Sequence, residues 1–135
     1  MNVFEPVNPS ALGTPRGYTH GLLAPAGWRV LFVAGQTAAN GDGHITEPGF
    51  VHQFQVALDK TLAVVQAAGG GPEHVARMTV YVTDMNAYRE SRSCLGDIWR
   101  NRMGRHYPAM ALLGVSHLVD EGATVEIEAT AVVPA

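Results

Sequence analysis

In Thr124-Val-Glu-Ile-Glu-Ala-Thr-Ala-Val-Val133, apolar and polar side chains alternate, and this alternation is the clearest indication of the fold. Successive side chains of a β-strand point to opposite faces of its sheet. The apolar set is Val125, Ile127, Ala129 and Ala131, and the polar set is Thr124, Glu126, Glu128 and Thr130. The stretch therefore predicts a strand that buries one face and presents a polar other face.

Residues 75–82 repeat this pattern, with Met78, Val80 and Val82 on one side. Residues 47–68 instead have apolar side chains at steps of three or four, which predicts a helix of about five turns. Gly69-Gly-Gly-Pro72 ends that helix, because glycine suits the left-handed cap and proline cannot continue it. Thr83-Asp84 precedes a second predicted helix at residues 85–102, with Asp84 as a favoured cap.

Two further strands are predicted at residues 30–34 and 109–115. The first is a short apolar run ended by Gly35, which suits a strand buried on both faces. The resulting order predicts one α+β domain over residues 1–135, a two-layer fold with two helices covering one face of a mixed sheet. The polar second face is either covered by a partner subunit in a closed homo-oligomer or open to solvent.

Composition excludes several classes of protein. The 135 residues carry nine basic and twelve acidic side chains, a net charge of −3 with no basic run, which argues against a nucleic-acid or membrane partner. The single cysteine, Cys94, excludes an internal disulfide and suits a reducing compartment. The first residues lack the features of a signal peptide, so we expect a cytoplasmic protein.

Two groups of residues could carry chemistry. Glu126 and Glu128 share one face of a strand and could act as acid and base or place a water molecule, although strands also carry glutamates on solvent faces. The five arginines in and after the second helix could bind a carboxylate, although most suit a solvated surface. They are Arg89, Arg92, Arg100, Arg102 and Arg105. The six histidines have no spacing typical of a zinc site.

Six landmarks then occur in a family-specific order. They are Gly17-Tyr18-Thr-His20, Leu31-Phe-Val-Ala-Gly-Gln36, Gln53 and Leu58 on a helix ending in Ala67-Ala68-Gly69, Val75-Ala-Arg-Met-Thr-Val-Tyr-Val-Thr-Asp84, Pro108-Ala109-Met110 and Val125-Glu-Ile-Glu-Ala129. From about residue 14 to residue 133, the chain resembles the Rid family of reactive intermediate deaminases, also called YjgF.

The resemblance implies a chorismate-mutase-like fold and a homotrimer with a central barrel and three clefts between neighbouring subunits. Active members hydrolyse enamines and imines made from amino acids to 2-keto acids and ammonia, with neither a metal nor an organic cofactor. In those members, the arginine of a "PAR" motif holds the substrate carboxylate. The first glutamate of "EIE" positions the attacking water. A tyrosine near the N-terminus and backbone groups near "SGQ" and "PAR" line the pocket.

These roles transfer only in part. Glu126 matches the water-positioning glutamate and Tyr18 matches the tyrosine. Ala34 replaces the serine of "SGQ", so one hydroxyl is missing. Met110 replaces the arginine after Ala109, and methionine cannot hold a carboxylate. An apolar Met110 suits a larger or less charged ligand.

The sequence therefore supports two hypotheses. In the first, favoured by Glu126, the protein is a Rid-like hydrolase of the imine or enamine deaminase type with an altered cleft between subunits. In the second, favoured by Met110 and Ala34, it is a non-catalytic trimer that binds a small metabolite. Arg92 lies where it could supply a substitute cation, or it points into water. Ribonuclease activity finds little support in an acidic chain without a basic and aromatic stripe.

Overall fold

The computed structural model describes residues 2–135. The elements in chain order are β1 (Glu5–Val7), the short 3-10 helix η1 (Ser10–Leu12), β2 (Gly21–Leu23), β3 (Arg29–Gln36), α1 (Phe50–Ala67), the 3-10 helix η2 (Pro72–His74), β4 (Val75–Val82), α2 (Met85–Glu90), α3 (Arg92–Met103), β5 (Ala109–Gly114) and β6 (Val125–Val133).

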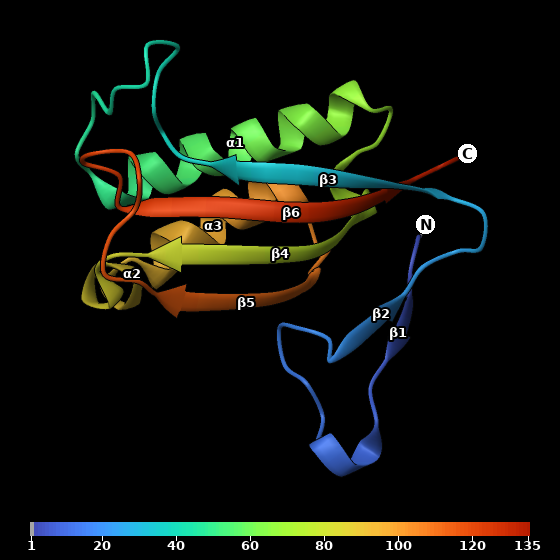
Figure 1. Cartoon of the computed structure of the whole chain (residues 1–135). Helices are drawn as coiled ribbons and strands as arrows, with labels where there is room; N and C mark the ends of the chain where they lie inside the picture. Colours follow the sequence, from blue (N-terminus) through green and yellow to red (C-terminus); the bar gives the residue numbers. More distant parts are fainter. Residues whose placement is uncertain (1) are drawn as a thin grey trace.

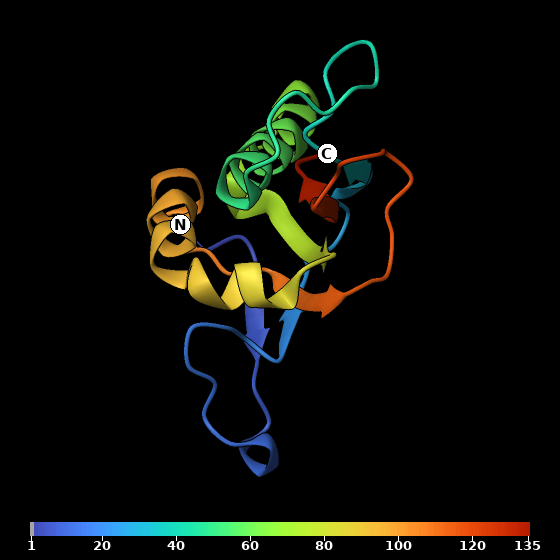
Figure 2. The ribbon, with the colours of Figure 1, turned by 90° about the vertical axis from the view of Figure 1, so that its left-hand side faces the viewer.

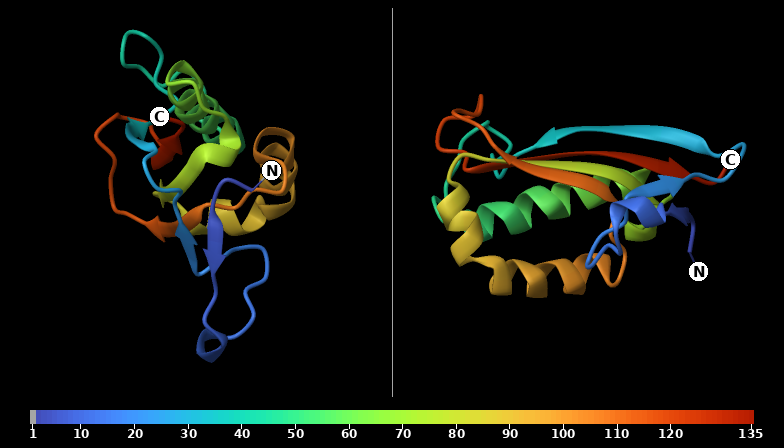
Figure 3. Two further views of the ribbon diagram at one scale, coloured as in Figure 1. Left: turned by 90° about the vertical axis from the view of Figure 1, so that its right-hand side faces the viewer. Right: turned by 90° about the horizontal axis from the view of Figure 1, so that it is seen from below.

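The main sheet has the strand order β3-β6-β4-β5 (Figure 1). Strands β4 and β5 are parallel, whereas β6 runs antiparallel to both β3 and β4. The helices cover one face of this sheet and leave the other face uncovered (Figure 3, right). The predicted two-layer α+β fold with a mixed sheet is confirmed.

Strand β6 is central because its two faces differ as the sequence predicts. Val125, Ile127 and Ala131 are fully buried against the helices. Burial of a side chain such as Val or Ile contributes roughly 1.5–3 kcal/mol, so this face stabilises the layer packing. Glu126 and Glu128 are only partly buried and point to the uncovered face.

Strand β3 corrects the prediction of a strand buried on both faces. It is an edge strand, and only its helix-facing side is covered. Val33 is buried, whereas Phe32 is 80% exposed on the uncovered face. The run therefore places apolar residues on both sides of the strand, but nothing within residues 2–135 covers the outer side.

The second predicted helix is interrupted at Ser91. The backbone of Ser91 leaves the α-helical region, with φ −102° and ψ 5°. Its N–H group donates to the carbonyl oxygen of Tyr88, three residues earlier, at 3.1 Å. Asp84 caps the first piece as predicted, because its carboxylate accepts hydrogen bonds from the backbone N–H groups of Asn86 and Ala87.

The N-terminal part forms a separate hairpin of β1 and β2 that extends away from the main sheet (Figures 1 and 2). Three of its apolar side chains are strongly exposed, namely Val7, Leu12 and Leu23. No helix within residues 2–135 has the length and hydropathy needed to cross a membrane.

Candidate functional site

Glu126 lies against the backbone of β3. A Cβ atom added to Gly35 would be only 2.0 Å from Oε2 of Glu126. The glycine therefore leaves the space that the carboxylate occupies. The neighbouring Ala34 is exposed, and its carbonyl oxygen accepts a hydrogen bond from Nε2 of Gln36 at 3.1 Å. The "GQ" segment and the first glutamate of "EIE" thus form one local group, as the resemblance implies.

The pKa of the Glu126 carboxyl is raised above its ordinary value. Partial burial is the largest cause, and the negative charges of Asp120 and Glu128 add to it. Asp120 is itself held in place, because it accepts a hydrogen bond from Oγ1 of Thr37. A carboxyl with a raised pKa is better suited to exchange protons near neutral pH than an ordinary glutamate is.

A buried amide supports this end of the sheet. Gln53 on α1 is fully buried, and its Nε2 donates to the carbonyl oxygens of Glu47 at 3.0 Å and Gly122 at 3.1 Å. Its Oε1 accepts from the N–H group of Thr124 at 2.9 Å. One side chain thus joins the segment before α1 to the segment that leads into β6, two residues before Glu126.

The single lysine supports the opposite side of the same site. Nζ of Lys60 donates to the carbonyl oxygens of Thr37 at 2.8 Å and Ala39 at 2.7 Å. These bonds fasten the loop after β3 to α1. Because Thr37 also holds Asp120, Lys60 helps to fix the charge that acts on Glu126.

Glu128 has a different environment, although it shares the uncovered face with Glu126. Its Oε1 accepts a hydrogen bond from the Tyr81 hydroxyl, and this bond is the main cause that raises the pKa of Tyr81. The two residues border a shallow hollow of about 280 Å³, whose other lining residues are Arg77, Thr79, Ala129 and Thr130. Glu128 is therefore engaged within the chain, whereas no hydrogen bond among residues 2–135 involves the carboxylate of Glu126.

Met110 lines a second hollow, on the helix side of β5. This hollow has a volume of about 330 Å³. Its lining residues are mostly apolar or aromatic: Gly17, Phe54, Val80, Tyr88, Arg92, Leu95, Gly96, Trp99, Tyr107, Met110 and Leu112. Two predicted site residues, Met110 and Arg92, thus border one hollow within a single chain.

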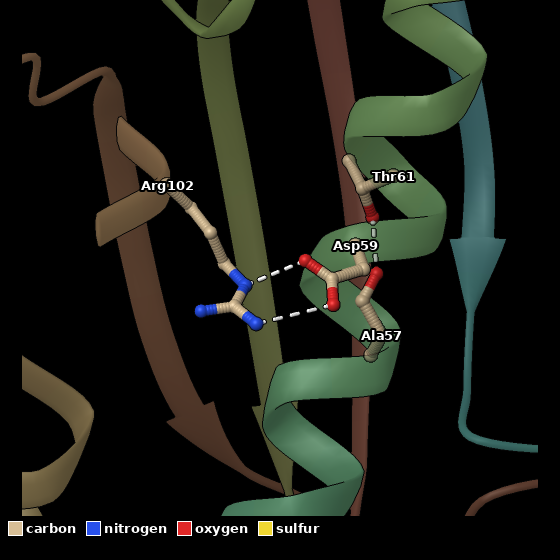
Figure 4. Close-up of polar contacts among 4 residues, drawn as sticks. All are labelled: Ala57, Asp59, Thr61 and Arg102. Atoms are coloured by element: carbon tan, nitrogen blue, oxygen red, sulfur yellow. Dashed lines mark hydrogen bonds and ion pairs between the residues drawn. The ribbon is translucent and has the colours of Figure 1, made fainter. Parts of the chain in front are cut away.

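The structure separates the five clustered arginines. Arg102 forms a two-point ion pair with Asp59 of α1, with Nε–Oδ1 and Nη2–Oδ2 distances of 2.5 and 3.3 Å (Figure 4). Arg100 pairs with Asp97 at 2.5 Å. Arg92 takes part in no ion pair among residues 2–135, and its guanidinium carbon lies 5.8 Å from the centre of the Tyr88 ring. Arg92 thus borders the Met110 hollow and is also exposed to solvent.

The predicted site residues fall into two groups on opposite faces of the sheet. Met110 is in register with the buried Met78, so it faces the helices. Glu126 is in register with Tyr81 and faces the uncovered side. Ala109 precedes Met110 and therefore points to the opposite face. A site that uses both Glu126 and the Met110 hollow would need two copies of the chain.

Tyr18 belongs to the Met110 side. It is 48% exposed, and its ring makes an edge contact with His20 at 5.3 Å between centroids. The preceding residue, Gly17, lines the Met110 hollow, and Tyr18 itself borders an adjoining hollow of about 400 Å³ together with Tyr107.

Sequence analysis missed the aromatic side chains that shape the Met110 hollow. Tyr88 and Trp99 lie within the helix predicted at residues 85–102, and Tyr107 lies between that helix and the strand predicted at residues 109–115. None of the three was predicted as a site residue. The available signal was position, because Tyr107 directly precedes Pro108-Ala109-Met110. The Trp99 ring stacks on the Tyr107 ring with centroids 5.9 Å apart, so the two form one wall.

Comparisons with known proteins identify the family of this chain. The sequence model of the family described as endoribonuclease L-PSP matches residues 10–133. A 2-iminobutanoate/2-iminopropanoate deaminase from Capra hircus is 29% identical over 125 residues, which cover 92% of this chain and 83% of the relative.

Two solved structures are similar to the whole fold. The Rid family protein YyfB from Yersinia pestis has a TM-score of 0.79 and 29% identity, with 98% of this chain and 100% of that chain covered. Escherichia coli TdcF with bound serine has a TM-score of 0.68 and 25% identity, with 89% and 91% covered. The chain therefore belongs to the Rid/YjgF family, which the endoribonuclease L-PSP model describes.

Proposed function

We propose that the protein hydrolyses imines or enamines derived from amino acids, with Glu126 positioning the attacking water. The observation that carries this proposal is the carboxylate of Glu126, which lies against Gly35 with a raised pKa and no protein partner among residues 2–135. A relative with 29% identity is named as a deaminase of 2-iminobutanoate and 2-iminopropanoate. A similar structure contains bound serine, a ligand with an amino-acid carboxylate.

The reaction needs no redox change. The oxygen of water bonds to the imine carbon, and the nitrogen accepts the protons needed to leave as ammonia. The C–N bond then breaks and a C=O bond forms, which gives the 2-keto acid. Glu126 accepts one proton from the water as the C–O bond forms and passes it to the nitrogen. It then transfers the hydroxyl proton of the carbinolamine to the same nitrogen as the C–N bond breaks, a general acid and base role that suits a raised pKa.

We also propose that the protein is a homotrimer and that the reaction takes place in clefts between copies, in the cytoplasm. The separation of Glu126 from the Met110 hollow supports this assembly, because a neighbouring copy can bring the two faces together. The 80% exposed Phe32 and the half-exposed Val30 on the uncovered face also favour a covering partner. Light scattering at micromolar concentration should give about three times the chain mass. A monomer at that concentration would contradict the proposal.

The test of the reaction is the substitution Glu126→Gln. Imines are generated in the assay by an amino-acid oxidase, and the release of 2-keto acid is followed. Loss of general acid and base catalysis should lower turnover by roughly 10²–10⁴-fold. If turnover is unchanged, Glu126 does not position the water.

The second candidate is a non-catalytic trimer that binds a small metabolite. Met110 favours it, because the usual carboxylate-binding arginine is absent from this position. Under this hypothesis, the wild-type chain binds 2-keto acids but accelerates the hydrolysis of no imine in a panel that runs from 2-iminopropanoate to the imine of phenylalanine. Acceleration of any of them that Glu126→Gln removes would exclude it.

A further inference from the structure

The size and lining of the Met110 hollow suit the binding of an apolar group. Its volume of about 330 Å³ lies within the range of roughly 300–1,000 Å³ that is typical of small-molecule sites. Leu95, Trp99, Met110 and Leu112 contribute apolar surface to it. None of the residues within 2–135 that line it carries a carboxylate, so an anion that enters it meets no like charge from these side chains.

Among the described residues that line the hollow, Arg92 is the only charged one. It is exposed, and no ion pair among residues 2–135 occupies its guanidinium. The Tyr88 ring lies beneath it at 5.8 Å, a contact that orients the guanidinium without neutralising it. Arg92 also begins the 12-residue helix α3, whose N-terminal end adds partial positive charge.

We infer that this hollow selects a carboxylate that carries a bulky apolar or aromatic side chain. Arg92 binds the carboxylate at the rim, and the apolar group lies between Trp99 and Met110. A short substrate such as 2-iminobutanoate would leave most of the apolar surface in contact with water. As a statement about substrate preference, this inference rests on the proposed function. The binding itself can be measured without any reaction.

Three compounds separate the two parts of the inference. The compound 3-phenylpropanoate has both a carboxylate and an aromatic group, butanoate has the carboxylate with a short chain, and 3-phenylpropanamide has the aromatic group without the charge. Their dissociation constants are measured by calorimetry with the full chain. The methyl NMR signal of Met110, assigned with Met110→Leu, reports whether the compound enters this hollow.

The variants are Arg92→Gln and a matched control, Arg89→Gln. Arg89 lies on α2, is exposed and does not line the hollow. We expect 3-phenylpropanoate to bind at least tenfold more tightly than either other compound and to shift the Met110 signal. Arg92→Gln should weaken its binding at least tenfold and leave 3-phenylpropanamide unchanged, while Arg89→Gln should change neither by more than twofold.

Three results would overturn the inference. Equal binding of 3-phenylpropanoate and butanoate would show that the hollow does not select an apolar group. Equal effects of Arg92→Gln and Arg89→Gln would show that Arg92 does not bind the carboxylate. No detectable binding of 3-phenylpropanoate at millimolar concentration would refute both claims. Turnover of the Glu126→Gln variant is a separate measurement, so failure of this inference is distinguishable from failure of the proposed reaction.

Discussion

Gly35→Ala tests whether the position of Glu126 matters for catalysis. The backbone of Gly35 has no positive φ, so alanine fits its conformation without strain. The added Cβ atom would lie 2.0 Å from Oε2 and 2.9 Å from Cδ of Glu126. Because these atoms are at the end of a flexible side chain, the carboxylate moves and the strand does not.

The distance between the added Cβ atom and Oε2 of Glu126 sets the smallest displacement of the carboxylate. Ordinary van der Waals contact to a Cβ atom begins at 3.4 Å, so Oε2 of Glu126 must move by at least about 1.4 Å. Misplacement of a catalytic group by about 1 Å can cost about 100-fold in rate. We therefore expect kcat/KM for imine hydrolysis to fall by about 100-fold, while the free energy of unfolding changes by less than about 1 kcal/mol.

The assay follows 2-keto acid release from imines generated by an amino-acid oxidase, and urea unfolding measures stability. Gly41→Ala is the matched control, because Gly41 has no positive φ and no atom within 4 Å of an added Cβ. The control should keep the wild-type kcat/KM. If Gly35→Ala keeps it too, the carboxylate of Glu126 at β3 is not part of the reaction.

Three further substitutions test the support by buried Gln53, the charge of Glu126 and the role of Met110 in its hollow. Gln53→Leu removes three hydrogen bonds from a fully buried amide and should lower the free energy of unfolding by about 3 kcal/mol in urea, whereas exposed Gln66→Leu should have almost no effect. The folded chain raises the pKa of Glu126 above 4.5, so ionisation of this carboxyl lowers the free energy of unfolding as the pH rises through the raised pKa. Glu126→Gln should therefore stabilise the chain against urea at pH 8 and lose this advantage at pH 4. Stabilisation confined to pH 4 would contradict a raised pKa of Glu126. Met110→Arg replaces apolar surface of the hollow with a second cation beside Arg92, so the ratio of kcat/KM for 2-iminobutanoate to kcat/KM for the imine of phenylalanine should rise at least tenfold, and an unchanged ratio would contradict a role of this hollow in substrate selection.

The fold could be predicted where the hydrophobic pattern determines which face is buried. In β6 and α1, one period runs unbroken through each element, and both were predicted with bounds within three residues of those observed. The interruption at Ser91 could not be predicted in this way. Tyr88 and Leu95 are seven residues apart, which is close to two helical turns, so the stripe continues in phase across the break.

The sequence names candidate site residues, but it does not give their arrangement. The helix predicted at residues 85–102 includes Leu95 and Trp99, but a helical period does not report whether the space between the helix and the sheet is filled. The exposure of Phe32 depends on whether another chain covers the sheet, and a local sequence pattern carries no information about such a chain. Gly35 was visible only as the end of a strand, because its closeness to Glu126 arises from the register of β3 with β6.

If the protein is the proposed homotrimer, the separation of Glu126 from the Met110 hollow has a consequence that can be measured in mixed trimers. A chain with Glu126→Gln keeps the hollow, and a chain with Met110→Asp, which places a negative charge in the hollow, keeps Glu126. If each cleft joins the Glu126 face of one copy to the hollow of the next, about a quarter of the clefts in a random equal mixture have both parts intact. Each variant alone should be inactive, and the mixture, after unfolding and refolding together, should recover about a quarter of wild-type kcat. If both parts were used within one chain, the mixture would stay inactive, and the proposed cleft between copies would be wrong.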